Sequence, residues 1–129
     1  MTGRWDPSGP IGAITIFAED LPATRSFYTE VFGLPVHFED ESSAVFRFGD
    51  TLVNLLDVAA APELIDPAPV GAPAGHRSVL TLHVDDVDAR CEWLLARGVE
   101  LLNGPITRPW GPRTASFRDP AGQIWEIAS

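Results

Sequence analysis

AITIFAEDLPAT, residues 13–24, returns in similar form as VLTLHVDDVDAR at residues 79–90. In each copy an alternating apolar run is followed by an aspartate and then by a segment of helical character. A second pair of stretches, FGDTLVNLL at residues 48–56 and FRDPAGQIWEI at residues 117–127, is also similar once two residues of turn are allowed for. We therefore predict two similar halves, and the polar residues at matched positions are the candidates for a site between them.

The first half is predicted to contain a strand, a helix and three further strands. Residues 12–18 alternate and are rich in β-branched side chains, as in a strand. Asp20 is placed to cap the following helix, and Gly33 to end it. The apolar stripe of this helix is Phe27, Tyr28, Val31 and Phe32. Strands are expected near residues 35–40, 43–49 and 51–57, the last two joined by a tight turn at Gly49-Asp50.

The second half is predicted to repeat this order. Residues 78–84 form its first strand, Asp86 caps its helix and Gly98 ends that helix. The expected buried stripe is Val87, Cys91, Leu94 and Leu95. Further strands are expected near residues 99–103, 113–118 and 123–128, with the Pro- and Gly-containing turn 119–122 between the last two.

A length of 129 residues predicts a single domain over residues 1–129. Within it we expect one module at residues 11–57 and a second at residues 78–128. Residues 58–77 hold four prolines and two glycines, so they form neither a long helix nor a central strand, and we interpret them as a linker.

The formal net charge of −9 argues against nucleic acid as a partner, because phosphate binding requires clustered Lys and Arg. It indicates either solubility alone or attraction of a cationic small molecule. No apolar run approaches 18 residues, the first ten residues do not look like a signal peptide, and Cys91 is the single cysteine. We therefore expect a soluble cytoplasmic protein without a membrane partner.

Three stretches, in this order along the chain, resemble the vicinal oxygen chelate superfamily: FAEDLPATRSFYTEVFGLPV, LHVDDVDARCEWLLARGVEL and FRDPAGQIWEIAS. This superfamily includes glyoxalase I, bleomycin resistance proteins and extradiol dioxygenases, and the resemblance covers nearly all of residues 12–128. It implies an α+β fold in which two paired βαβββ modules form a curled, cleft-bearing mixed sheet with helices on the outer face. It also implies a homodimer.

Metal-dependent members of this superfamily place one ligand on the first strand of each module and one on its last strand. The matching positions are Ala13 and Val79 on the first strands and Asn54 and Glu126 on the last strands. Ala13 and Val79 carry no donor atom. One carboxylate and one amide do not supply the three or four ligands that a transition metal needs. We therefore expect neither a metal nor another cofactor.

Strand alternation predicts which side chains face the cleft. On the first strands these are Ala13, Thr15 and Phe17 in one half, and Val79, Thr81 and His83 in the other. Glu126 is expected in the same cleft, because Trp125 and Ile127 beside it point the opposite way. Two interpretations of Glu126 stay open: it pairs with Arg113 or Arg47, or it binds a ligand or acts as a base.

Aromatic residues complete the predicted site. Trp110 lies between two prolines and beside a glycine, so it either stacks on a planar ligand or cation, or covers a barrel end or a dimer seam. Phe117 is expected to line the cleft wall together with Phe17. Trp93 is expected to pack against an edge or a second subunit, and His37 and His76 are interpreted as structural or surface residues.

These observations lead to three hypotheses. The first is a metal-free small-molecule-binding protein of the bleomycin-resistance type. Its expected ligand-binding residues are Glu126, Asn54, Thr15, Phe17, Thr81, His83, Trp110 and Arg113. The second is a glyoxalase-like lyase or isomerase that uses Glu126 as general base or as ligand of a weakly held metal. The third is a remnant domain with a structural or partner-binding role.

Overall fold

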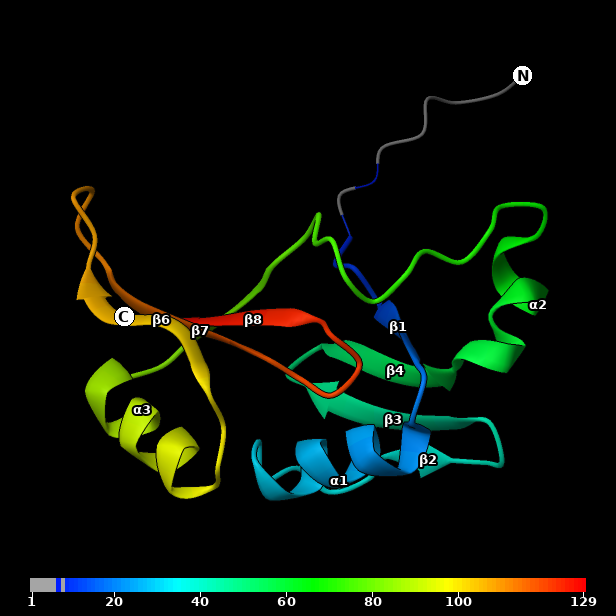
Figure 1. Cartoon of the computed structure of the whole chain (residues 1–129), viewed down its shortest axis with the longest axis horizontal. Coiled ribbons are helices and arrows are strands. Elements are labelled where there is room, and N and C mark those ends of the chain that lie inside the picture. Colours follow the sequence, from blue (N-terminus) through cyan, green and yellow to red (C-terminus); the bar gives the residue numbers. More distant parts are fainter. Residues whose placement is uncertain (1–6, 8) are drawn as a thin grey trace.

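The computed structural model describes residue 7 and residues 9–129, and the statements below concern those residues. The chain forms two four-stranded mixed sheets, and α1 and α3 lie on the same side of them (Figure 1). The expected α+β arrangement of two βαβββ modules is confirmed. The sheets remain open and do not close into a barrel.

The sheet of the first half has the strand order β1-β4-β3-β2. Only β1 and β4 are parallel to one another. The strands are β1 (Ala13–Ala18), β4 (Thr51–Asp57), β3 (Ser43–Phe48) and β2 (Phe38–Glu39). The sheet of the second half repeats this order with β5 (Leu80–His83), β8 (Ile124–Ala128), β7 (Arg113–Arg118) and β6 (Leu101–Thr107).

The two long helices begin and end where the sequence predicts. Before α1 (Leu21–Glu30) and α3 (Val87–Ala96), the side chains of Asp20 and Asp86 accept backbone N–H groups of the first helical turn. Gly33 and Gly98 follow these helices with positive φ values of 69° and 77°. None of the helices in the described part of the chain has the length and apolar character needed to span a membrane.

Some predicted boundaries are wrong. The strand expected near residues 35–40 is reduced to the two residues of β2, and β6 continues to Thr107 because this residue pairs with Arg113. Leu95 was expected in the buried stripe of α3 but is 56% exposed. The sheet covers only a narrow side of this helix, formed by the buried Val87, Cys91 and Leu94.

The apolar sides of both halves join in one core beneath the sheets. The ring of Tyr28 in α1 lies 5.3 Å from that of Phe46 and 6.1 Å from that of Trp125 in β8, between ring centroids. Trp93 of α3 donates its indole N–H to the carbonyl of Val31, so it packs against the end of α1. The linker contains only the short helices η1 (Val58–Ala60) and α2 (Pro62–Ile65).

Candidate functional site

Two matched polar pairs lie on the side of the sheets that faces away from the helices. Thr15 of β1 is directly opposite Asn54 of β4, and Thr81 of β5 is directly opposite Glu126 of β8. The Thr81 hydroxyl donates to Glu126 Oε1 at 2.9 Å, and Asn54 Nδ2 lies 3.5 Å from Thr15 Oγ1. Asn54 and Glu126, the matched residues on the last strands of the two halves, therefore each lie beside a threonine. One of them is neutral and the other is acidic.

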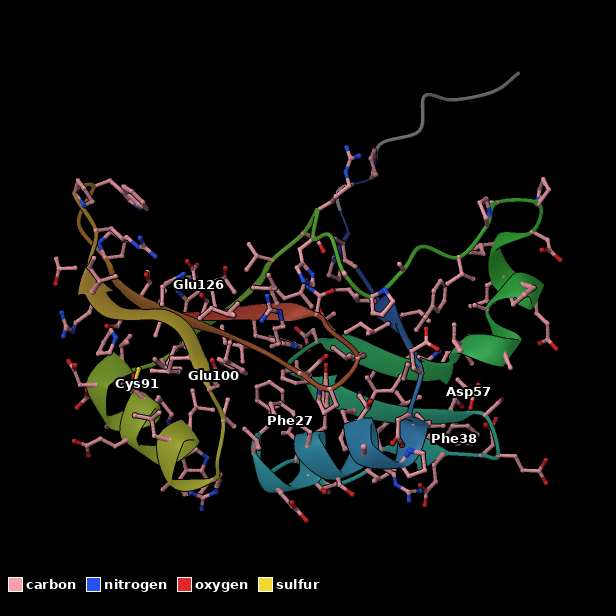
Figure 2. The ribbon with its side chains drawn as sticks, viewed as in Figure 1. Phe27, Phe38, Asp57, Cys91, Glu100 and Glu126 are labelled. Atoms are coloured by element: carbon pink, nitrogen blue, oxygen red, sulfur yellow. The ribbon has the colours of Figure 1, made fainter. Side chains whose placement is uncertain are left out.

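Glu126 points away from the core, as the alternation of its strand predicts. Its neighbours Trp125 and Ile127 are buried on the helix side, whereas Glu126 is half-buried and lies on the opposite side of the sheet from Phe27 and Cys91 (Figure 2). Its cross-strand neighbour on β7 is Ser116. The carboxylate therefore has a hydroxyl group as its hydrogen-bond partner and forms no ion pair among the described residues.

Of the two arginines considered as partners of Glu126, Arg113 pairs with a different carboxylate. Arg113 makes a two-pronged ion pair with Asp88 of α3, with Nε 2.8 Å and Nη2 2.9 Å from the two carboxylate oxygens. Hydrogen bonding from Arg113 lowers the pKa of the Asp88 carboxyl. Arg113 points to the helix side because it alternates with Thr114 on β7. Arg47 is exposed and forms no ion pair within the described residues.

Arg108 was not predicted as a site residue, but it reaches the face that carries Glu126. Thr114 shares the side of β7 with Ser116, and Arg108 Nε donates to its hydroxyl at 2.8 Å. Arg108 Nη2 also donates to Asn103 Oδ1 at 3.0 Å. Trp110 and Arg113 are the residues of segment 108–113 that the sequence predicts for the site, and no sequence signal indicates the extension of β6 that brings Arg108 beside Thr114. The face therefore holds an acceptor at Glu126 and a donor at Arg108.

The predicted aromatic residues are not gathered around Glu126. Phe117 is fully buried beneath the sheet, so its expected place in the cleft wall is wrong. Trp110 is 74% exposed in the loop between β6 and β7. Phe17 is half-buried and lines a cavity of about 210 Å³ against residues 70–78, a cavity that His76 also lines. His83 is exposed, two residues beyond Thr81 on the same side of β5.

The Thr15–Asn54 pair contains one polar atom without a hydrogen-bond partner among the described residues. This atom is the buried Asn54 Oδ1. A buried acceptor without a partner is costly, so such atoms in native proteins usually meet a water or a ligand donor. Together with the Glu126 carboxylate it makes this face rich in acceptors.

A buried polar cluster joins the two halves within the core, on the helix side of the sheets. The Tyr28 hydroxyl donates to Asp119 Oδ2 at 2.6 Å, and the other oxygen accepts the backbone N–H groups of Ala121 and Gln123. Burial raises the pKa of the Asp119 carboxyl, although its hydrogen bonds oppose this shift. Burial and the nearby Asp119 also raise the pKa of Tyr28 far above its ordinary value. The sequence indicated only a turn at residue 119.

Comparison with known proteins places this geometry in a family. The model of the Glyoxalase/Bleomycin resistance protein/Dioxygenase superfamily matches residues 11–127. The chain belongs to this superfamily.

Individual relatives agree with the assignment to the glyoxalase/bleomycin resistance superfamily. Uncharacterized protein YraH of Bacillus subtilis (strain 168) is 31% identical over 119 residues, which cover 88% of this chain and 93% of that protein. A glyoxalase/bleomycin resistance protein/dioxygenase from Nocardioides has a TM-score of 0.82 at 26% identity, covering 99% of this chain and 85% of that one. A lactoylglutathione lyase from Agrobacterium tumefaciens has a TM-score of 0.74 at 25% identity, covering 95% of each chain.

The donor set does not fit the metal of the superfamily's metal-dependent members. Ala13 and Val79 offer no donor atom, and Asn54 and Glu126 are bonded to threonine hydroxyls in separate pairs. Within residues 7 and 9–129, no three His, Cys, Asp or Glu side chains are grouped so as to hold a metal ion. The groups that this face offers to a ligand are therefore the side chains themselves.

Proposed function

We propose that this chain binds a small molecule at the face carrying Glu126 and Asn54, and that it does so without a metal. The observation that carries the proposal is the pair Thr81–Glu126, in which a half-buried carboxylate has a hydroxyl partner at 2.9 Å and no ion pair among the described residues. A carboxylate with such neutral neighbours favours a ligand that brings a positive charge or hydrogen-bond donors.

The second pair supports the same class of ligand. Asn54 Oδ1 is an unused acceptor, and the net charge of −9 attracts cations from a distance. Arg108 borders the same face and would meet an acceptor or a negative group at the other end of the ligand. The proposed ligand is therefore a molecule rich in hydrogen-bond donors, which the protein sequesters as bleomycin resistance proteins do. The proposed binding species is a cytoplasmic homodimer in which the second copy covers the open face.

A screen followed by calorimetry tests the proposal. Metabolites and cationic antibiotics are screened by thermal shift, and the affinity of any stabilising compound is then measured for the wild type and for Glu126→Gln. Glu100→Gln is the matched control, because Glu100 is exposed on the helix side of the molecule (Figure 2). Weaker binding confined to Glu126→Gln supports the proposal. Equal affinity in all three proteins contradicts it.

An enzymatic alternative is favoured by one comparison. The similarity to a lactoylglutathione lyase at 25% identity suggests a lyase or isomerase in which Glu126 acts as general base. Each compound found in the screen should be followed by NMR for conversion. Turnover that falls by roughly 10²–10⁴-fold in Glu126→Gln would favour the enzyme. Binding without conversion would favour sequestration.

A further inference from the structure

A separate cavity lies between the second sheet and α3, on the opposite side of the sheet from Glu126. Its volume is about 240 Å³. Leu82, Phe117 and Ile127 form its sheet wall, Leu94 its helix wall, and Phe32 closes it toward α1. Leu82 and Ile127 face this cavity because they are the strand neighbours of Thr81 and Glu126, which point the other way. We call this space the α3 cavity.

The α3 cavity is large enough for an apolar group. A dry cavity of roughly 150 Å³ lined by Leu, Ile and Phe suffices to bind benzene. The walls here are of the same kind, and Leu94, Phe117 and Ile127 are at most 4% exposed. An aromatic ring or a short alkyl chain would therefore gain contacts that the empty space lacks.

The mouth of the α3 cavity carries positive charge. Trp93 lines the cavity, is 37% exposed and is held by the hydrogen bond from its indole N–H to the Val31 carbonyl at 2.8 Å. Guanidinium groups flank its ring, with Cζ of Arg97 3.0 Å and Cζ of Arg90 5.6 Å from the ring centroid. Arg90 itself lines the cavity.

Neither arginine has a carboxylate partner in the described part of the chain. The ion pairs found there are Arg25–Glu39 and Arg113–Asp88. Arg90 shares a hollow with Asp85 and Asp86, and Arg97 shares another with Glu30 and Glu100. None of these carboxylates forms an ion pair with either arginine. In a chain of net charge −9, Arg90 therefore presents a guanidinium group without an ion pair at the mouth of this apolar cavity.

We propose that the α3 cavity binds a small aromatic or aliphatic carboxylate. The apolar part occupies the space between Leu82, Leu94 and Phe117, and the carboxylate lies at the mouth against Arg90. This site is separate from the face that carries Glu126 and does not depend on the function proposed for that face.

Three compounds with one ring and different charges test this proposal. Phenylacetate, phenylacetamide and 2-phenylethylamine are titrated into the ¹⁵N-labelled protein, and the indole N–H of Trp93 is assigned in the spectra with Trp93→Phe. We expect phenylacetate to shift this signal at the lowest concentration, the amide at a higher one and the amine at the highest. No shift by phenylacetate up to about 10 mM, or the same affinity for all three compounds, would overturn the proposal.

Variants locate the site. Arg90→Gln should weaken phenylacetate binding by about three- to tenfold, as expected for a solvent-exposed charge, whereas the matched control Arg77→Gln should not. Leu82→Phe should abolish binding by filling the cavity. If that variant does not fold, Arg90→Gln decides alone, and unchanged affinity there refutes the carboxylate site. Glu126→Gln should leave phenylacetate binding unchanged, which separates this test from that of the proposed function.

Discussion

The ligand-binding role proposed for Glu126 depends on the groups that surround its carboxylate. Its partner is the Thr81 hydroxyl and its cross-strand neighbour is Ser116, so its negative charge is solvated but not neutralised. Arg113, one of the two arginines considered as its partner, is bound to Asp88 on the other side of the sheet. A carboxylate that forms no ion pair and lies on an open face is free to bind a ligand, which is the role proposed for Glu126.

Glu126→Gln is predicted to weaken the binding of a cationic ligand by about 1.5–3 kcal/mol, the contribution of a hydrogen bond to a charged group. The glutamine can still accept the Thr81 hydroxyl, so we expect the free energy of unfolding to change by less than about 1 kcal/mol. Calorimetry and urea unfolding measure the two quantities on the same protein. A variant that loses most of its stability but keeps its affinity per folded molecule would show that Glu126 is structural.

Asp119 gives a prediction for pH. Burial raises its pKa in the folded chain, so between the unfolded and folded pKa values the folded chain binds the additional proton. The stability that this residue contributes is therefore fully present below its ordinary pKa of 3.8 and is lost as pH rises through the folded value. Asp119→Asn does not titrate. We expect the unfolding free energy of the wild type minus that of Asp119→Asn to fall as the pH rises above 3.8, the ordinary pKa of the carboxyl.

Urea unfolding of both proteins at several pH values measures this difference. Well below pH 10 the other titrating groups cancel in the subtraction, because they are common to the two proteins and because Tyr28, whose pKa Asp119 raises above its ordinary 10.0, stays protonated in both. A difference that grows with pH would mean that the hydrogen bonds from Tyr28, Ala121 and Gln123 outweigh burial and lower the pKa of Asp119 instead.

At the scale of elements, β6 bends where Gly104 meets β7. The pairing of β6 with β7 shifts register between Asn103 and Ile106, and Gly104 has a φ of +87°. A Cβ atom at this position would overlap the backbone of Thr114 and lie 2.7 Å from Cα of Ala115. The close approach of the two strands therefore requires glycine.

Gly104→Ala and Gly98→Ala separate steric overlap from backbone strain. Both glycines have positive φ, but nothing lies within 4 Å of a Cβ at Gly98. We expect Gly98→Ala to cost about 1 kcal/mol of stability from strain alone. Gly104→Ala should cost about 1–3 kcal/mol more because the strands must move apart. Thermal or urea unfolding measures both, and equal costs would show that β6 adjusts freely.

For the whole molecule, the residues at the four family ligand positions predict that neither folding nor stability depends on a metal. Since Ala13 and Val79 supply no ligands, EDTA should leave the melting temperature unchanged, and metal analysis of protein purified without chelator should give far less than one zinc, nickel, iron or manganese ion per chain. One tightly bound transition metal per chain, lost on mutation of Glu126, would contradict this prediction.

The open sheets also predict a homodimer. Their outer face carries the two polar pairs uncovered, and exposed sheet edges in native proteins are normally covered. Light scattering at several concentrations should give the mass of two chains. Because the cleft would then be formed by both copies, dilution that separates the chains should also weaken ligand binding. A single-chain mass at high concentration would refute the dimer.

The order of the elements and the caps of the two long helices could be predicted from the sequence alone. Capping by Asp20 and Asp86, termination at Gly33 and Gly98, and alternation along the strands act within a few residues of the chain. The orientation of Glu126 away from the core follows from that alternation alone. So does the match between its surroundings and those of Asn54, because the halves repeat.

Only the tertiary structure decided which distant residues meet. Arg113 forms an ion pair with Asp88 because β7 packs over α3, and Tyr28 contacts Asp119 because the two halves share one core. Leu95 is exposed because the sheet covers only a narrow side of its helix. These contacts depend on how whole elements pack against one another. Short-range periodicity in a sequence does not predict that packing, because it reports only on neighbouring residues of one element.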